Sequence, residues 1–78
     1  MFWLVFDTAR GPCVILQPAS SLIFARIAAS TAHKLDPKGF QEGHQLDAKL
    51  LKKIPKGLVG KRLTSKEAAG LLKRMGGH

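Results

Sequence analysis

Two apolar runs near the start of the chain, separated by a short turn segment, constrain the fold more than any other feature. Residues 2–7 and 13–17 are apolar at nearly every position, and residues 8–12, Thr-Ala-Arg-Gly-Pro, lie between them. Two such runs around a short Gly/Pro segment predict a β-hairpin. Because so few positions are polar, we expect the strands to be covered on at least one face.

A long helix is predicted after the hairpin. Ser20 or Ser21 can cap its start, and Pro37 disfavours helix at Asp36, so the helix ends there or earlier. Its apolar residues recur at helical spacing: Leu22, Ile23, Ile27, Thr31 and Leu35, with Phe24 beside them. The alanines at 25, 28, 29 and 32 make the helix slim, so we expect it to lie close across the hairpin.

The second half predicts two shorter helices. Asp47 can cap a helix over residues 48–54, which Pro55 ends, and residues 56–63 form a connection. Thr64 and Glu67 match a capping box, so a last helix begins at Thr64 or Ser65. Its predicted apolar stripe is Ala68, Leu71, Leu72 and Met75, and Gly76 and Gly77 end it. Within this helix, close packing against another element is the expected reason for Gly70. Residues 38–43 are either a loop or a third strand.

These elements give an α+β fold in which an N-terminal hairpin, with or without a third strand, packs against one long and two shorter helices. The 78 residues make one small basic domain, 1–78, whose core leaves no room for an internal cofactor. Cys13 is the single cysteine, so no internal disulfide is expected, and a reducing compartment suits it. We find no leader peptide and no membrane span, so we expect a cytoplasmic protein.

The charge is unevenly divided. Residues 1–30 carry two arginines and one aspartate, whereas residues 31–78 carry eleven Lys and Arg against four Asp and Glu, a net of +7. On a helix over residues 48–54, lysines spaced i, i+3, i+4 and i+7 would share one face, where they repel one another and suit a polyanion. A second cluster flanks the last helix, whose N-terminal amides favour an anion. The candidate anion-binding residues are Lys49, Lys52, Lys53, Lys56, Lys61, Arg62, Thr64, Ser65 and Lys66.

Two short resemblances lie in the same region. Gly57-Leu58-Val59-Gly60 resembles the GxxG loop of KH domains over four residues. A chain of 78 residues with eight glycines is expected to contain about one such motif by chance. Residues 62–72 are similar to the first helix of excisionase-type helix-turn-helix domains, but the chain ends six residues later without a recognition helix. We carry no functional residue over from either family.

We therefore expect a non-catalytic binding protein that contacts nucleic-acid phosphates through its C-terminal half. The alternative is a regulatory factor that docks on an acidic protein partner or forms a homodimer through the hairpin edge. Both a monomer and a homodimer fit the sequence. Cys13, His33 and His44, with Asp36 or Asp47, are the only candidates for catalysis, and their spacing indicates neither an active site nor a metal site. No cofactor is expected.

Overall fold

The computed structural model describes residues 1–74, and it confirms the expected α+β fold. Within that range the strands are β1 (Phe2–Thr8), β2 (Gly11–Gln17), β3 (Phe40–Gln45) and β4 (Arg62–Thr64). The α-helices are α1 (Leu22–His33), α2 (Ala48–Leu51) and α3 (Ser65–Arg74), with short 3₁₀ helices η1 (Pro37–Gly39) and η2 (Lys56–Leu58). The predictions for Met75, Gly76 and Gly77 lie outside the described residues.

The hairpin forms the centre of a four-stranded antiparallel sheet. The strand order is β3-β1-β2-β4, and β1 pairs with β2 along its whole length, from Phe2 opposite Gln17 to Thr8 opposite Gly11. A third strand, one of the two alternatives for residues 38–43, is therefore present as β3. β4 was not predicted: it covers the last two residues of the expected connection and Thr64, a possible start of the last helix. β1 and β2 each have two neighbours, although β4 pairs only with Cys13–Ile15 of β2. The sheet ends at β3 and β4, and the homodimer through the hairpin edge stays a prediction.

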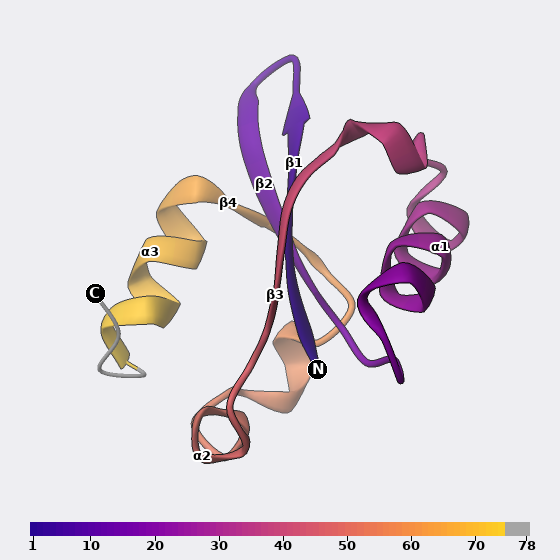
Figure 1. The fold of residues 1–78 in the computed structure, drawn as a ribbon. Helices are drawn as coiled ribbons and strands as arrows, with labels where there is room; N and C mark the ends of the chain where they lie inside the picture. The colour runs from indigo at the N-terminus through magenta and orange to yellow at the C-terminus, as the bar shows by residue number, and fades with distance from the viewer. Residues whose placement is uncertain (75–78) are drawn as a thin grey trace.

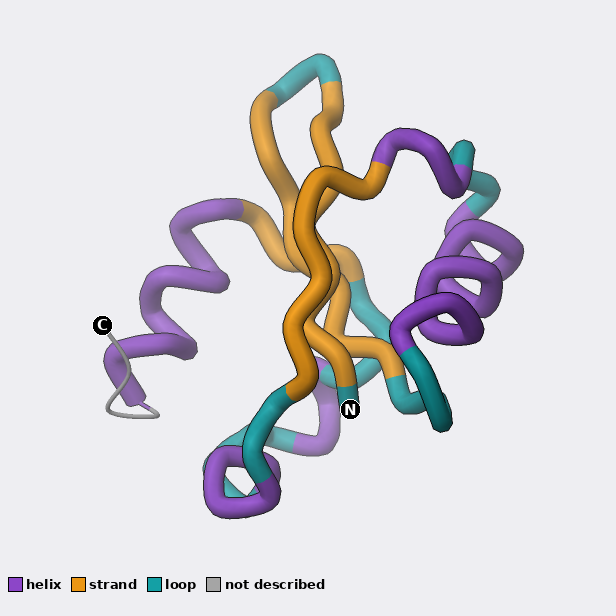
Figure 2. Tube along the Cα trace, in the orientation of Figure 1, coloured by secondary structure: helices purple, strands orange, loops and turns teal. Residues whose placement is uncertain are grey.

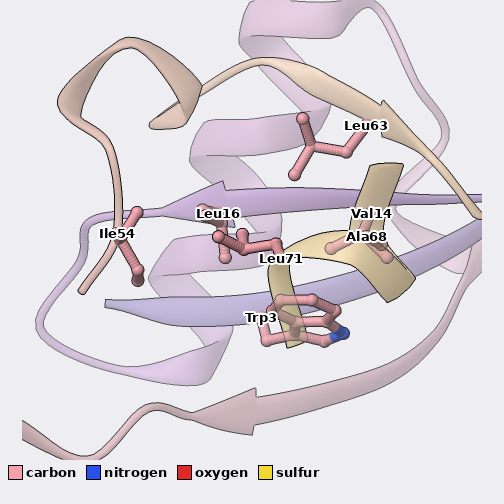
Figure 3. Packing of buried hydrophobic residues seen from close by; sticks show 7 residues of the cluster. All are labelled: Trp3, Val14, Leu16, Ile54, Leu63, Ala68 and Leu71. Carbon is pink, nitrogen blue, oxygen red and sulfur yellow. The ribbon is translucent and has the colours of Figure 1, made fainter. Parts of the chain in front are cut away.

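Helices cover the two faces of this sheet, α1 one face and α3 the other (Figures 1 and 2). Side chains alternate along a strand, so β1 and β2 contribute to two cores. The core beneath α3 consists of Trp3, Val14, Leu16, Ile54, Leu63, Ala68 and Leu71 (Figure 3). The core beneath α1 consists of Phe2, Leu4, Phe6, Ile15, Ala25, Ala29 and Phe40. Covering on both faces explains why the hairpin strands have so few polar positions.

The orientation of α1 differs from the expectation. Ser21 caps it as predicted, accepting a hydrogen bond from the Phe24 amide at 3.3 Å. However, the residues that face the sheet are small: Ala25 and Ala29 are fully buried, and Ser30 is nearly so. Most of the predicted apolar stripe points the other way. Three phenylalanine side chains from the sheet occupy most of the space beneath α1. The residues of α1 that face the sheet are therefore small, because the interior is close-packed.

A β-bulge in the pairing of β1 with β3 decides which side chains of β3 enter the core. Leu4 lies opposite Gly43 and Val5 opposite Glu42, but Phe6 lies opposite Phe40 rather than Gln41. The extra residue moves Phe40 to the α1 face, where its ring meets the Phe6 ring edge-on with centroids 5.7 Å apart. Without the bulge, alternation would place Phe40 on the opposite face.

Two further local predictions have mixed outcomes. Asp47 caps α2, accepting from the Lys49 amide, but α2 ends at Leu51 instead of residue 54. Gly70 lies on an exposed part of α3, and a Cβ added there would meet no other atom within 4 Å, so close packing does not explain it.

No helix in residues 1–74 has both the length and the apolar character needed to cross a membrane.

Candidate anion-binding pocket

The predicted lysine face is not one helix face, because α2 ends too early. Only Lys49 lies within α2, while Lys52 forms its C-cap, Lys53 lies in the following turn and Lys56 begins η2. All four side chains are exposed, and so is Lys61. The lysines remain close in sequence at one end of the sheet, but their i, i+3, i+4, i+7 alignment does not survive. We call residues 49–56 the lysine segment.

A pocket of about 610 Å³ lies at the other end of the sheet, beside the hairpin turn. Three cations from three elements line it: Arg10 from the β1–β2 turn, Arg62 from β4 and Lys66 from the first turn of α3. The remaining lining residues are Thr8, Ala9, Pro12, Cys13, Thr64 and Ser65. No carboxylate belongs to this lining. The arrangement is suited to an anionic group, since like charges gather there without a neutralising partner.

Arg62 also has a structural role. Its Nη2 donates to the carbonyl oxygen of His33 at 2.6 Å, and its guanidinium carbon lies 5.8 Å from the centre of the Phe6 ring. The first contact satisfies a carbonyl at the C-terminus of α1, where a positive charge complements the helix dipole. Arg62 thus connects β4 to α1, and only part of its hydrogen-bonding capacity remains for a ligand.

The hydroxyl groups predicted to donate to a phosphate already have acceptors within the protein. Thr64 Oγ1 donates to Glu67 Oε1 at 3.0 Å and accepts from the Glu67 amide at 3.2 Å, while Glu67 Oε1 also accepts from the Thr64 amide. This is the predicted capping box. Ser65 Oγ donates to the Pro12 carbonyl at 2.7 Å and joins α3 to β2. Both hydroxyls hold the pocket wall together, so the cations are the groups left to bind an anion.

Almost none of the positive charge is neutralised within the protein. Across residues 1–74, the one ion pair joins His44 Nε2 to Glu42 Oε2 at 3.3 Å, and it involves neither a lysine nor an arginine. Asp36 and Asp47 accept backbone amides as helix caps, and Glu67 closes the capping box. Asp7 accepts a hydrogen bond from the Gln41 side chain. None of the carboxylates in residues 1–74 is therefore paired with a lysine or an arginine, and ion pairs leave the net charge of +8 uncompensated.

The two cationic regions lie at opposite ends of β2. The Gly60 amide donates to the carbonyl of Leu16 near the C-terminal end of β2, whereas Thr64 pairs with Cys13 near its N-terminal end. Three residues of β2, a rise of about 10 Å, therefore separate the end of the lysine-segment connection from the pocket. Lys61 lies between them on the path of the chain.

Sequence reasoning missed Arg10, which lies in the weakly charged part of the chain. Its position in the predicted hairpin turn was visible, but its closeness to Lys66 depends on the pairing of β2 with β4. That pairing brings residues about fifty positions apart to one pocket: Ser65 bonds to Pro12, two residues from Arg10. A local sequence pattern does not predict a contact between residues so far apart in the chain.

The candidate catalytic residues are not brought together. Cys13 packs beside the core under α1, while His44 lies opposite Trp3, on the other face of the sheet and two strands away. His33 ends α1, and within residues 1–74 no three His, Cys, Asp or Glu side chains are grouped closely enough to hold a metal ion.

The Gly57–Gly60 segment leads into a strand, β4, and not into a helix, and its last glycine adopts a φ of +78°. A left-handed conformation of this kind favours glycine, which accounts for Gly60 without a nucleic-acid role. No protein-family model, curated protein or solved structure matches this chain.

Proposed function

We propose that this protein binds nucleic acid through its phosphates, with the pocket formed by Arg10, Arg62 and Lys66 as the principal contact. The observation that supports the proposal is the convergence of three cations from three elements on one pocket that has no carboxylate in its lining. Phosphate oxygens are the anionic groups that arginine and lysine side chains bind in nucleic acids.

An extended polyanion fits the charge distribution better than a small anion does. A single phosphate would occupy the pocket alone and leave the lysine segment without a role. A strand passing from the pocket along β4 toward Lys61 and the lysine segment would meet cations over its whole path. The described basic half contains one aromatic residue, Phe40, which is buried, so the contacts proposed here are to the backbone rather than to stacked bases.

The test is a salt titration of binding to a single-stranded RNA, a single-stranded DNA and a DNA duplex, each labelled for fluorescence anisotropy. About five neutralised phosphates give a slope of log K against log salt near −4.5 for a duplex and near −3.5 for a single strand. Arg10→Gln combined with Lys66→Gln should reduce the magnitude of the duplex slope by about 1.8. Arg62 is left unchanged because it also anchors α1.

The matched control carries the same change of charge elsewhere. Lys38 precedes the opposite edge strand and Lys73 lies near the end of α3, so Lys38→Gln with Lys73→Gln should weaken binding much less. Equal losses from both double variants would mean that net charge, and not the pocket, binds the polyanion. Absence of binding to all three nucleic acids at low salt would overturn the proposal. Binding of poly-glutamate without binding of nucleic acid would favour the acidic protein partner instead.

A further inference from the structure

The outer edge of β3 carries backbone groups that no other strand of the described chain pairs with. β3 ends the sheet on one side, and within residues 1–74 its one neighbour is β1. The Leu46 amide donates to the Met1 carbonyl at 3.0 Å. Because inward and outward groups alternate along an antiparallel strand, the N–H and C=O groups of Gly43 and Gln45 point away from β1. In Figure 1, β3 is the foremost strand and no helix passes in front of it. A free edge of this kind is a template for another strand.

The side chains of this edge place a carboxylate and an imidazole on the same face of the sheet. Glu42 and His44 are two residues apart in β3, so they point to the same side, and both are largely exposed. His44 Nε2 lies 3.3 Å from Glu42 Oε2. Within residues 1–74 no other hydrogen bond engages these two side chains, so Glu42 Oε1 and His44 Nδ1 remain for a partner.

A second copy of β3 complements this edge when the two strands run antiparallel and are centred on Gly43. Gly43 then lies opposite Gly43 of the second copy, and each Glu42 lies opposite the His44 of the other chain. Centring the pair on residue 42 would place two carboxylates opposite each other, and centring it on residue 44 would place two imidazoles opposite each other. Opposite charges across strands are stabilising and like charges are destabilising, so the side chains select the register centred on Gly43.

We infer that this protein forms a homodimer in which the two β3 strands pair antiparallel about a twofold axis at Gly43. The two sheets become one continuous sheet, and the same edge of each copy forms the contact. The anion-binding pockets beside β4 then lie at the two outer edges, so the cations that line them stay remote from each other. β3 has six residues, about 20 Å of strand, so the contact is small and the dimer weak. The inference does not rest on nucleic-acid binding.

The first experiment is sedimentation equilibrium over a series from about 10 µM to about 1 mM, a range that suits a weak interface. The average mass should rise from the 8.5 kDa of one chain toward twice that value. Glu42→His and His44→Glu each remove both imidazole–carboxylate pairs of the homodimer, so each should weaken it by about tenfold. A mixture of the two variants should recover the association, because every imidazole then lies opposite a carboxylate of the other chain.

The controls repeat the same changes of charge away from β3. Ala69 is exposed on α3, a helix that packs on β2 and β4, so Ala69→Lys and Ala69→Glu should leave the mass unchanged. A mass of one chain at every concentration would overturn the dimer. Equal weakening by the Ala69 variants would overturn the assignment of the contact to β3. If the mixture of Glu42→His and His44→Glu chains did not recover the association, the register would be wrong.

The second experiment tests the register directly in a Cys13→Ser background. A mixture of the Glu42→Cys and His44→Cys chains should form a mixed disulfide on oxidation, because directly opposed residues of this type have Cα atoms about 4.5 Å apart. Either variant alone should be linked much more slowly, since its two cysteines would be diagonal neighbours about 7–8 Å apart. A disulfide that forms faster within one variant than in the mixture would overturn the pairing centred on Gly43.

Discussion

The face of α1 that is buried against the sheet differs from the apolar face that the sequence predicted, and the stability of point variants can distinguish the two. Ala29 is fully buried between α1 and the sheet, and Ile27 is 51% exposed. Substituting Ala29→Ile adds three carbons where there is no space, and overpacking of this kind costs about 1–3 kcal/mol. The lower helix propensity of isoleucine adds about 0.4 kcal/mol. We therefore expect a loss of about 2–3 kcal/mol in the free energy of unfolding.

Ile27→Ala should cost far less. Full burial of an isoleucine contributes about 1.5–3 kcal/mol, so a side chain that is half exposed loses about 1 kcal/mol when it is removed. Alanine regains about 0.4 kcal/mol through its helix propensity, which leaves a net loss of about 0.6 kcal/mol. Ala32→Ile, at an exposed alanine of the same helix, is the matched control and should cost only the propensity difference.

Urea unfolding followed by the fluorescence of Trp3, the single tryptophan and a core residue, measures all three variants. The expected gap between Ala29→Ile and Ile27→Ala, about 2 kcal/mol, corresponds to about 8–16 °C in Tm for a domain of this size. If Ile27→Ala were the more destabilising variant, α1 would have to be rotated by roughly half a turn.

Two further substitutions test α3, each by urea unfolding. Gly70→Ala should stabilise the protein by about 0.5–1 kcal/mol, because the added Cβ meets no neighbour and alanine is the better helix former; a loss of stability would show that the glycine conformation is needed. Thr64→Ala should cost about 1 kcal/mol by removing the capping box, whereas Ser20→Ala, at an exposed serine that does not cap α1, should change stability by less than about 0.5 kcal/mol. Equal effects of the two would contradict the capping role.

Local chemistry made several elements predictable. Ser21, Asp47 and the Thr64–Glu67 pair each satisfy amides within three residues of themselves, so the starts of all three helices could be located from the sequence. The hairpin was predictable for the same reason, since its two runs and its turn are adjacent. The length of α2 was not predictable from the sequence. Residues 52–54 continue the helical spacing of apolar residues, but the helix ends before them and Ile54 is buried in the core beneath α3.

The candidate site was predicted only in part. Lys66 and Arg62 stand out because they flank a helix start, but the pairing of β2 with β4 brings Arg10 to the same pocket. The same contacts give Thr64 and Ser65 acceptors within the protein, so the predicted phosphate donors became part of the wall. Hydrogen-bonding partners that are distant in sequence cannot be assigned from residue type and spacing.

The sequence by itself determined the class of fold, the hairpin and the helix starts, because those depend on interactions between near neighbours. Only the tertiary structure decided which strands flank the hairpin, which face of α1 is buried, and where the positive charges meet. Those outcomes follow from matching volumes across the sheet. Phenylalanines on β1 and β3 fill the space beneath α1, so alanines face them, and Ile23, Phe24 and Ile27 are left on the outside.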